Sequence, residues 1–190
     1  MPSPAPSTEP VEPLRLRLYP DPVLMRRALP IPSPEADPAA WDQLRERVDK
    51  MFDIMYESRG IGIAAPQVGW SARIFVINLT SEPDFGDEEL VFVNPEITAP
   101  KGEDSMEEGC LSLPDIRAEV DRPERISIRA LDEWGNPFEI SAYGMLARCI
   151  QHEFDHLDGI LFVKRLGMTA KMKVKRALKD LEKKYKEERA

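Results

Sequence analysis

The only two histidines of this 190-residue chain, His152 and His156, stand four positions apart in the stretch QHEFDHLDG. On a helix, that spacing places both imidazoles on one face and one turn apart, so that both can bind the same ion. The preceding residues, MLARCI, are mostly apolar, which is typical of a helix that packs into a core. The stretch therefore predicts half of a metal site on a buried helix. A surface helix that binds no metal is the alternative.

Glu153 follows the first histidine and completes the pattern His-Glu-x-x-His, which is typical of metal-dependent hydrolases. A carboxylate beside a metal-bound water can accept the proton of that water. We therefore expect Glu153 to be a general base rather than a ligand. A catalytic site of this kind has three protein ligands and one position open to water, so one ligand has to come from elsewhere in the chain.

Two usual sources of the third ligand are excluded or poorly placed. Position 162, where the longer metalloprotease motif has a third histidine, is Phe162. The first glutamate after Glu153 is Glu182, and it lies in a segment that is predicted to form a separate helix. The two cysteines of the chain remain as candidates.

Cys149 shares a helix face with the histidines, but it lies roughly 10 Å along the axis from His156, too far for a short side chain. Cys110 lies in the stretch EGCLSLP, where Gly and Pro permit a sharp backbone approach. We therefore predict that Cys110, His152 and His156 bind the metal and that Cys149 is a small buried side chain. A purely apolar packing role for Cys110 is the alternative.

Composition narrows the classes of function. A net charge of −8 argues against general nucleic-acid binding, and we expect no DNA partner. No apolar run approaches the roughly 18 residues of a membrane span, and the first residues lack the apolar segment of a secretion signal. Two cysteines without a disulfide framework fit a reducing compartment. We expect a cytoplasmic protein with no membrane partner.

Three segments of the chain differ in composition. Residues 1–13 are rich in Pro and Ser and are expected to form a flexible arm. Residues 14–166 contain the candidate site residues and are expected to form the catalytic domain. Residues 167–190 are expected to form a basic amphipathic helix. From residue 164 onward, eleven Lys and Arg outnumber four Asp and Glu, which gives +7 against −15 for residues 1–163.

The spacing of apolar residues predicts both helices and strands. A period of three to four residues predicts helices over residues 38–58, 144–157 and 169–188, the second ending at Gly159. Alternating or β-branched residues predict strands at 14–18, 73–79, 90–93, 118–120, 125–131 and 138–141, the last two forming a hairpin. The acidic residues 81–89 are expected to form a solvated loop. The acidic residues 103–108 would be read as a loop in the same way, were it not for the Gly-Cys pair that follows them.

The run GIGIAAPQVG at residues 60–69 consists of small and apolar residues with one polar side chain, Gln67. Its glycines would allow a ligand or another backbone to approach closely. By itself, this run fits tight packing as well as it fits a binding site.

Taken together, the stretches GIGIAAPQVG, EGCLSLP and QHEFDHLDG resemble, in this order, the three signature motifs of bacterial peptide deformylases. The similarity also includes the Leu-Tyr-Pro-Asp-Pro stretch at residues 18–22 and extends over residues 14–190. Members of this family remove the formyl group from the N-terminal formyl-methionine of nascent chains. The resemblance implies an α+β fold of antiparallel strands around a central His-Glu-x-x-His helix. It also implies one divalent ion, Fe²⁺ in most members, at a site that Zn²⁺, Co²⁺ or Ni²⁺ can also occupy.

The resemblance also assigns roles to individual residues. Glu153 would be the general base and acid, and the Gln67 amide and the Leu111 N–H would stabilise the oxyanion. Substrate backbone would lie along residues 60–63 as an added strand. The residues implied in substrate binding are Gly60, Ile61, Gly62, Ile63, Gly109, Met145 and Cys149.

The C-terminal helix of the family is associated with docking on the ribosome. Here it implies salt-sensitive ribosome binding through Lys171, Lys173, Lys175, Arg176 and Lys179. A solvated helix with one docked face is the alternative.

Two other classes of function stay open at this stage. One is a His-Glu-x-x-His metallopeptidase that cleaves internal bonds, which Cys110 argues against. The other is a non-catalytic binding module with a structural metal, for which the chain offers no convincing fourth ligand.

Overall fold

A five-stranded antiparallel sheet in the order β1-β2-β3-β6-β7 forms the centre of the computed structural model, which describes residues 13–188. Its strands are β1 (Gly62–Ala64), β2 (Ile74–Ile77), β3 (Leu90–Lys101), β6 (Arg125–Leu131) and β7 (Pro137–Tyr143). Helices pack on both faces of this sheet where β2 lies, so β2 is buried on both sides. Strand β2, which reads Ile-Phe-Val-Ile, is fully buried at all four positions.

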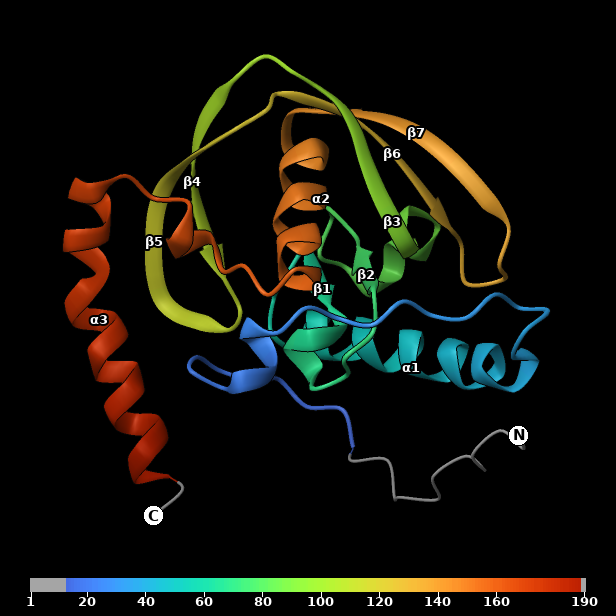
Figure 1. Ribbon diagram of the computed structural model, residues 1–190, viewed down its shortest axis with the longest axis horizontal. Helices are drawn as coiled ribbons and strands as arrows, with labels where there is room; N and C mark the ends of the chain where they lie inside the picture. Colours follow the sequence, from blue (N-terminus) through green and yellow to red (C-terminus); the bar gives the residue numbers. More distant parts are fainter. Residues whose placement is uncertain (1–12, 189–190) are drawn as a thin grey trace, which may run out of the picture.

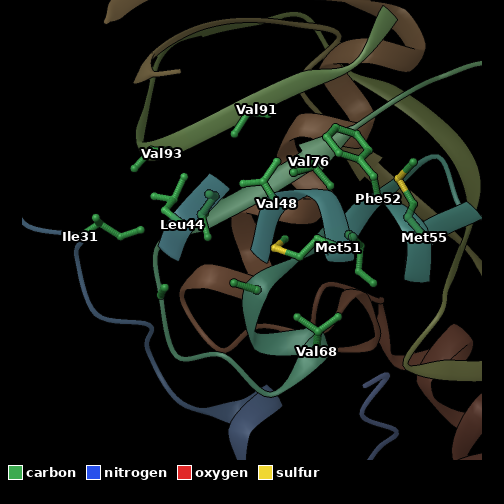
Figure 2. Packing of buried hydrophobic residues seen from close by; sticks show 14 of the residues in the cluster. Ile31, Leu44, Val48, Met51, Phe52, Met55, Val68, Val76, Val91 and Val93 are labelled. Atoms are coloured by element: carbon green, nitrogen blue, oxygen red, sulfur yellow. The ribbon is translucent and has the colours of Figure 1, made fainter. Parts of the chain in front are cut away.

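Helix α1 (Pro38–Glu57) covers one face of the sheet. Side chains along a strand point alternately to opposite faces, so Ile74 and Val76 of β2 face α1 while Phe75 and Ile77 face away. Figure 2 shows the apolar side of α1 over Val76 of β2 and over Val91 and Val93 of β3. The side chains that α1 buries here are Trp41, Leu44, Val48, Met51, Phe52 and Met55.

Helix α2 (Gly144–Leu157) packs on the opposite face of the sheet. Its apolar residues Ala147, Ile150 and Leu157 are fully buried with Phe75 and Phe92 from the centre of the sheet. Figure 1 shows α2 in the middle of the molecule, between the long strands on one side and a separate β-hairpin on the other. This central position buries ten of the residues of α2, including both histidines.

The separate hairpin consists of β4 (Asp104–Cys110) and β5 (Leu113–Arg122). Helix α3 (Met168–Glu187) lies along the outer side of β5, at the edge of the molecule (Figure 1). Val174 of α3 is buried in the same apolar cluster as Leu113, Ile116 and Val120 of β5. Short 3-10 helices connect these elements. They are η1 (Pro22–Met25), η2 (Ala65–Val68), η3 (Pro83–Glu88), which is kinked at Phe85, and η4 (Phe162–Lys164).

The predicted α+β class is confirmed, and so are the three helices, to within one residue at each end. The predicted hairpin at 125–131 and 138–141 is β6–β7. None of the helices in the described part of the chain is long and apolar enough to cross a membrane. The predicted arm at 1–13 falls almost entirely on residues outside the described range.

The strand predicted at 14–18 is wrong, because residues 13–18 form no strand. They are extended, and the N–H groups of Arg15 and Arg17 donate to the carbonyls of Val68 and Gln67 at 3.3 and 2.7 Å. These carbonyls belong to the 3-10 helix η2, which cannot form the regular hydrogen-bond ladder of a β-sheet. Conversely, the acidic residues 103–108 belong almost wholly to strand β4 rather than to a loop, because they pair with β5 in regular antiparallel register.

Candidate metal centre and active site

Two glycines frame the helix that carries both histidines. Helix α2 begins at Gly144, with φ of +57°, directly after β7, and it ends before Gly159, with φ of +69°. A Cβ at Gly159 would lie 2.7 Å from the backbone carbonyl carbon of Met25, so both the conformation and the space require glycine there. The predicted C-terminal stop is therefore confirmed, and the last turn of α2 is held against the N-terminal segment.

The three predicted ligands come together. The thiol of Cys110 and one ring nitrogen each of His152 and His156 all lie within 4.8 Å of one another. Cys110 Sγ lies 3.3 Å from His156 Nε2. Cys110 ends β4 at a register shift, where it lies opposite Leu113, and this turn brings the thiol to α2.

Glu108 holds the first histidine in place. His152 Nδ1–H donates to Glu108 Oε2 at 2.8 Å, which leaves Nε2 as the nitrogen for a metal. Arg122 donates to both oxygens of Glu108 at 2.5 and 2.9 Å, and Arg148 donates to Oε1 at 2.7 Å. All four side chains are nearly inaccessible to solvent. The carboxylate is thus fixed by two cations before it fixes the histidine.

The donor set fits a divalent metal ion. One thiolate and two imidazoles are ligands that Zn²⁺, Fe²⁺ and related ions accept, and the three donor atoms are close enough for one ion. Burial lowers the pKa of His152, but hydrogen bonds with Cys110 and Glu108 outweigh burial and raise it to about 10. Burial and the neighbouring His152 hold the pKa of His156 well below its usual value. Metal binding would therefore release the proton of His152.

Glu153 lies beside this cluster as a buried carboxylate with one free oxygen. Its side chain is 4% exposed, and within the described residues Oε2 has no hydrogen-bond partner. Burial raises the pKa of Glu153 to about 7, and a cation at the cluster would lower it again. A Cβ at Gly62 would lie 2.9 Å from Oε1, so β1 passes this carboxylate at a distance that only glycine permits.

The Gln67 side chain is oriented by its own backbone neighbourhood. Its Oε1 accepts the N–H of Ala64 at 2.8 Å, which points Nε2 toward the cluster. Nε2 lies 3.5 Å from Cys110 Sγ and donates to Ser112 Oγ at 3.3 Å. Gln67 is 1% exposed, so the amide cannot turn without losing these contacts. It is the one polar side chain of the glycine-rich run, and it lies next to the predicted ligands.

A cavity of about 530 Å³ opens onto these groups. Gln67, Cys110, His152 and Glu153 line it, and so do Leu111 and six of the seven residues predicted to bind substrate. Ile63 is the exception, because its side chain is fully buried in the cluster under α1. The six are Gly60, Ile61, Gly62, Gly109, Met145 and Cys149.

Comparison with known proteins agrees with this geometry. The sequence model of the polypeptide deformylase family matches residues 13–172. The chain belongs to this family. A peptide deformylase of Chromobacterium violaceum is 45% identical over 170 residues, which are 90% of this chain and 96% of that protein.

Solved structures of deformylases give the same result. A plant peptide deformylase has a TM-score of 0.87 at 40% identity and covers 96% of each chain. The enzyme of Plasmodium falciparum has a TM-score of 0.84 at 40% identity, covering 90% of this chain and 97% of its own. The family match ends within α3, so the resemblance up to residue 190 is longer than the match.

Cys149 is a small buried side chain, as predicted. It is 5% exposed, its Sγ contacts the Ile61 carbonyl oxygen at 3.7 Å, and it is not part of the ligand cluster. Burial raises the pKa of the Cys149 thiol well above its usual value, which keeps the group neutral. Its place is in the wall of the deformylase cavity.

The residues that support the ligands were not predicted from the sequence. Glu108, Arg122 and Arg148 surround His152, yet none belongs to the predicted site. One signal could have pointed to Arg148, which lies among apolar residues on the predicted metal helix, where an unpaired charge would be unfavourable. No local signal identifies its partner, because Glu108 is 40 residues away in the sequence.

Proposed function

We propose that this deformylase hydrolyses the N-terminal formyl group of formyl-methionyl nascent polypeptides and releases formate. One observation carries the proposal. A buried carboxylate with a free oxygen, Glu153 Oε2, lines one cavity with a fixed amide donor and with Cys110 and His152 of the Cys-His-His cluster. These are a base, a metal-ligand set and an oxyanion donor, which together suit hydrolysis of a small amide.

Cys110, His152 and His156 would hold one divalent ion, with Fe²⁺ as the resident metal and Zn²⁺, Co²⁺ or Ni²⁺ as substitutes. The ion would lower the pKa of a water molecule and polarise the formyl oxygen. Glu108 supports this arrangement, since it keeps the His152 ring in a fixed orientation. Metal analysis of protein that has been purified without oxygen would identify the resident ion.

The side chains of the protein would move the protons. Glu153 accepts the proton of the attacking water and donates it to the nitrogen of the leaving amine, so it returns to its starting state. The Gln67 amide and the Leu111 N–H donate hydrogen bonds to the oxygen that becomes negative in the tetrahedral intermediate. The hydrogen bond from Ala64 N–H supports this role, because it fixes the amide before substrate binds.

The substrate would bind as an extra strand. β1 is the edge strand of the sheet, so within the described residues the side away from β2 has no strand partner. A peptide that pairs there would place its formyl group next to Glu153. The methionine side chain would enter the apolar part of the cavity, which is formed by Ile61, Met145 and Cys149.

Release of formate from a formylated Met-Ala-Ser peptide by metal-loaded protein tests the proposal, with Glu153→Ala as the control. The wild type should produce formate, and Glu153→Ala should retain its metal and fold but lose nearly all activity. No formate from the wild type, or cleavage of internal bonds in an unformylated peptide, would contradict the proposal and favour a metallopeptidase. Substantial activity in Glu153→Ala would contradict the role of the base.

A second proposal concerns α3 and the ribosome. Residues 14–166 would form the catalytic domain, and the segment 167–190, which contains α3, would bind ribosomal RNA, close to emerging substrates. Five of the basic residues of this segment support the proposal, because all five are exposed on α3 and none of them has a salt-bridge partner within residues 13–188. They are Lys171, Lys173, Lys175, Arg176 and Lys179.

Cosedimentation with ribosomes at low and moderate salt tests this second proposal. Reversal of all five charges should abolish binding while deformylation of a short peptide persists. Unchanged cosedimentation would leave α3 with a structural role, which its buried contacts with β5 already give it.

A further inference from the structure

Arg59 is a charged residue at the mouth of the cavity that the proposed chemistry does not use. It lines the cavity next to Gly60, Ile61 and Gly62, and it is exposed. Within residues 13–188, no acidic side chain lies close enough to form a salt bridge with it. A free guanidinium therefore lies beside the segment along which we expect substrate to pair.

The backbone at Arg59 is unusual. Its φ is +57°, in the left-handed region that disfavours side chains with a Cβ. Arg59 N–H donates to the Tyr56 carbonyl and Gly60 N–H donates to the Met55 carbonyl, both at 2.9 Å. This is the pattern of a helix C-terminus at which glycine usually occupies the position of Arg59. A strained non-glycine residue at the rim of an active site is a reason to look for a function.

The burial of residues 62–65 determines in which direction the rest of the substrate can leave the cavity. Beyond Gly62, the chain continues through Ile63, Ala64 and Ala65, which are fully buried, so a bound peptide cannot leave in that direction. It has to leave past Gly60 toward Arg59. Gly62 faces Glu153, and three residues of extended chain span roughly 10 Å. The second or third residue of the substrate would therefore lie near Arg59.

We propose that Arg59 makes the enzyme favour substrates with an acidic side chain at the second or third residue, where formyl-methionine is the first. This inference rests on the proposed deformylase function and adds a specificity to it. An exposed ion pair is weak, so the expected preference for Glu over Gln is roughly two- to fivefold in kcat/KM. The contact is remote from the reacting bond, so the difference should appear in KM rather than in kcat.

The other exposed charges that line the cavity belong to the hairpin β4–β5. Arg117 Nη1 lies 4.0 Å from Glu107 Oε1, and both side chains are more than half exposed. This pair should therefore neither attract nor repel an acidic substrate appreciably. Asp115 also lines the mouth and would oppose an acidic substrate. A peptide that pairs along residues 60–62 lies against the wall of Arg59, so the effect of Arg59 should exceed that of Asp115.

The test uses amidated peptides formyl-Met-X-Y-Ala, with Glu, Gln or Lys at X or at Y, and the metal-loaded enzyme. The wild type should prefer Glu over Gln and Gln over Lys at one of the two positions, and the preference should shrink in high salt. Arg59→Gln should bring the ratio to about one, Arg59→Lys should restore most of it, and Arg59→Glu should favour Lys. Lys50→Gln, on an exposed site of α1 outside the cavity, is the matched control and should leave the ratio unchanged.

Equal kcat/KM for Glu, Gln and Lys in the wild type would overturn the inference, and so would a preference that survives in Arg59→Gln. In either case, turnover of the neutral peptide would leave the proposed function intact. Absence of turnover for every formylated peptide would instead refute the proposed function itself. A preference that appears in kcat alone would show that Arg59 acts on the chemistry rather than on binding, which would also contradict the proposal.

Discussion

Replacing Glu108 by Gln removes a buried negative charge that holds two arginines and one histidine of the candidate metal site. Arg122 and Arg148 are 3% and 4% exposed, so neither guanidinium can turn to water. Removing one partner of a buried ion pair costs about 3–5 kcal/mol. Arg122 keeps a second carboxylate, Asp155, at 2.9 Å, which places the expected loss near the lower figure.

Urea unfolding measures this loss, with chelator present so that a difference in metal affinity does not enter. With a slope of about 2 kcal/mol/M, a loss of ~3 kcal/mol lowers the midpoint by about 1.5 M. Glu139→Gln is the matched control, because Glu139 accepts from Arg129 at 2.9 Å but both side chains are at least half exposed. That control should lose no more than about 1 kcal/mol.

A second measurement separates stability from the metal site. Without Glu108, the His152 ring loses its fixed orientation, and metal affinity should fall roughly 10- to 100-fold in a competition with chelator. If Glu108→Gln unfolds at the same urea concentration as Glu139→Gln and binds metal as tightly, the buried network has neither of the roles assigned to it here.

Three further predictions concern the ligands, the oxyanion donor and the docking of α3. Metal analysis should show a large loss of bound ion in Cys110→Ala but not in Cys149→Ala; equal loss in both, or in neither, would contradict the ligand assignment. Gln67→Ala should lower kcat by roughly 10²- to 10³-fold, measured as formate release at saturating peptide. Burial and the hydrogen bond to Glu182 raise the pKa of Tyr19 to about 12, so the folded state holds this proton more tightly than the unfolded state does. The corresponding stability is present below pH 10 and is lost as the pH rises toward 12. The thermal unfolding temperature of Tyr19→Phe should therefore fall less over that pH range than that of the wild type.

The helices could be predicted because their signals are local. Six apolar residues at a spacing of three and four locate α1, and Gly159 marks the end of α2 because only glycine fits that close approach. Both histidines are in one of these helices, so the spacing argument applied directly to the site. Cys110 followed because Phe162 and the distant Glu182 excluded the usual third ligands.

The strands around the site were harder to predict because their partners are far away in the sequence. β1 has only three residues, and its glycine and small side chains read as a loop or a ligand-binding run. β4 reads as acidic and solvated because its buried position, Glu108, is itself acidic. The carboxylate is buried only because Arg122 and Arg148 reach it from β5 and α2, and one local stretch contains no sign of such a partner.

The same buried carboxylate joins the assembly of the fold to the assembly of the site. Glu108 and Cys110 both lie on β4, two residues apart, so one docking event brings the third ligand and the support of His152 to α2. That docking is favourable only when the anion on β4 meets the cations on β5 and α2, because Glu108 without these arginines would be buried without a partner. The hairpin β4–β5 is therefore held in the register that places the Cys110 thiol beside both histidines. Formation of the metal site and closure of the hairpin on the helix should thus be one cooperative step, in which loss of either weakens the other.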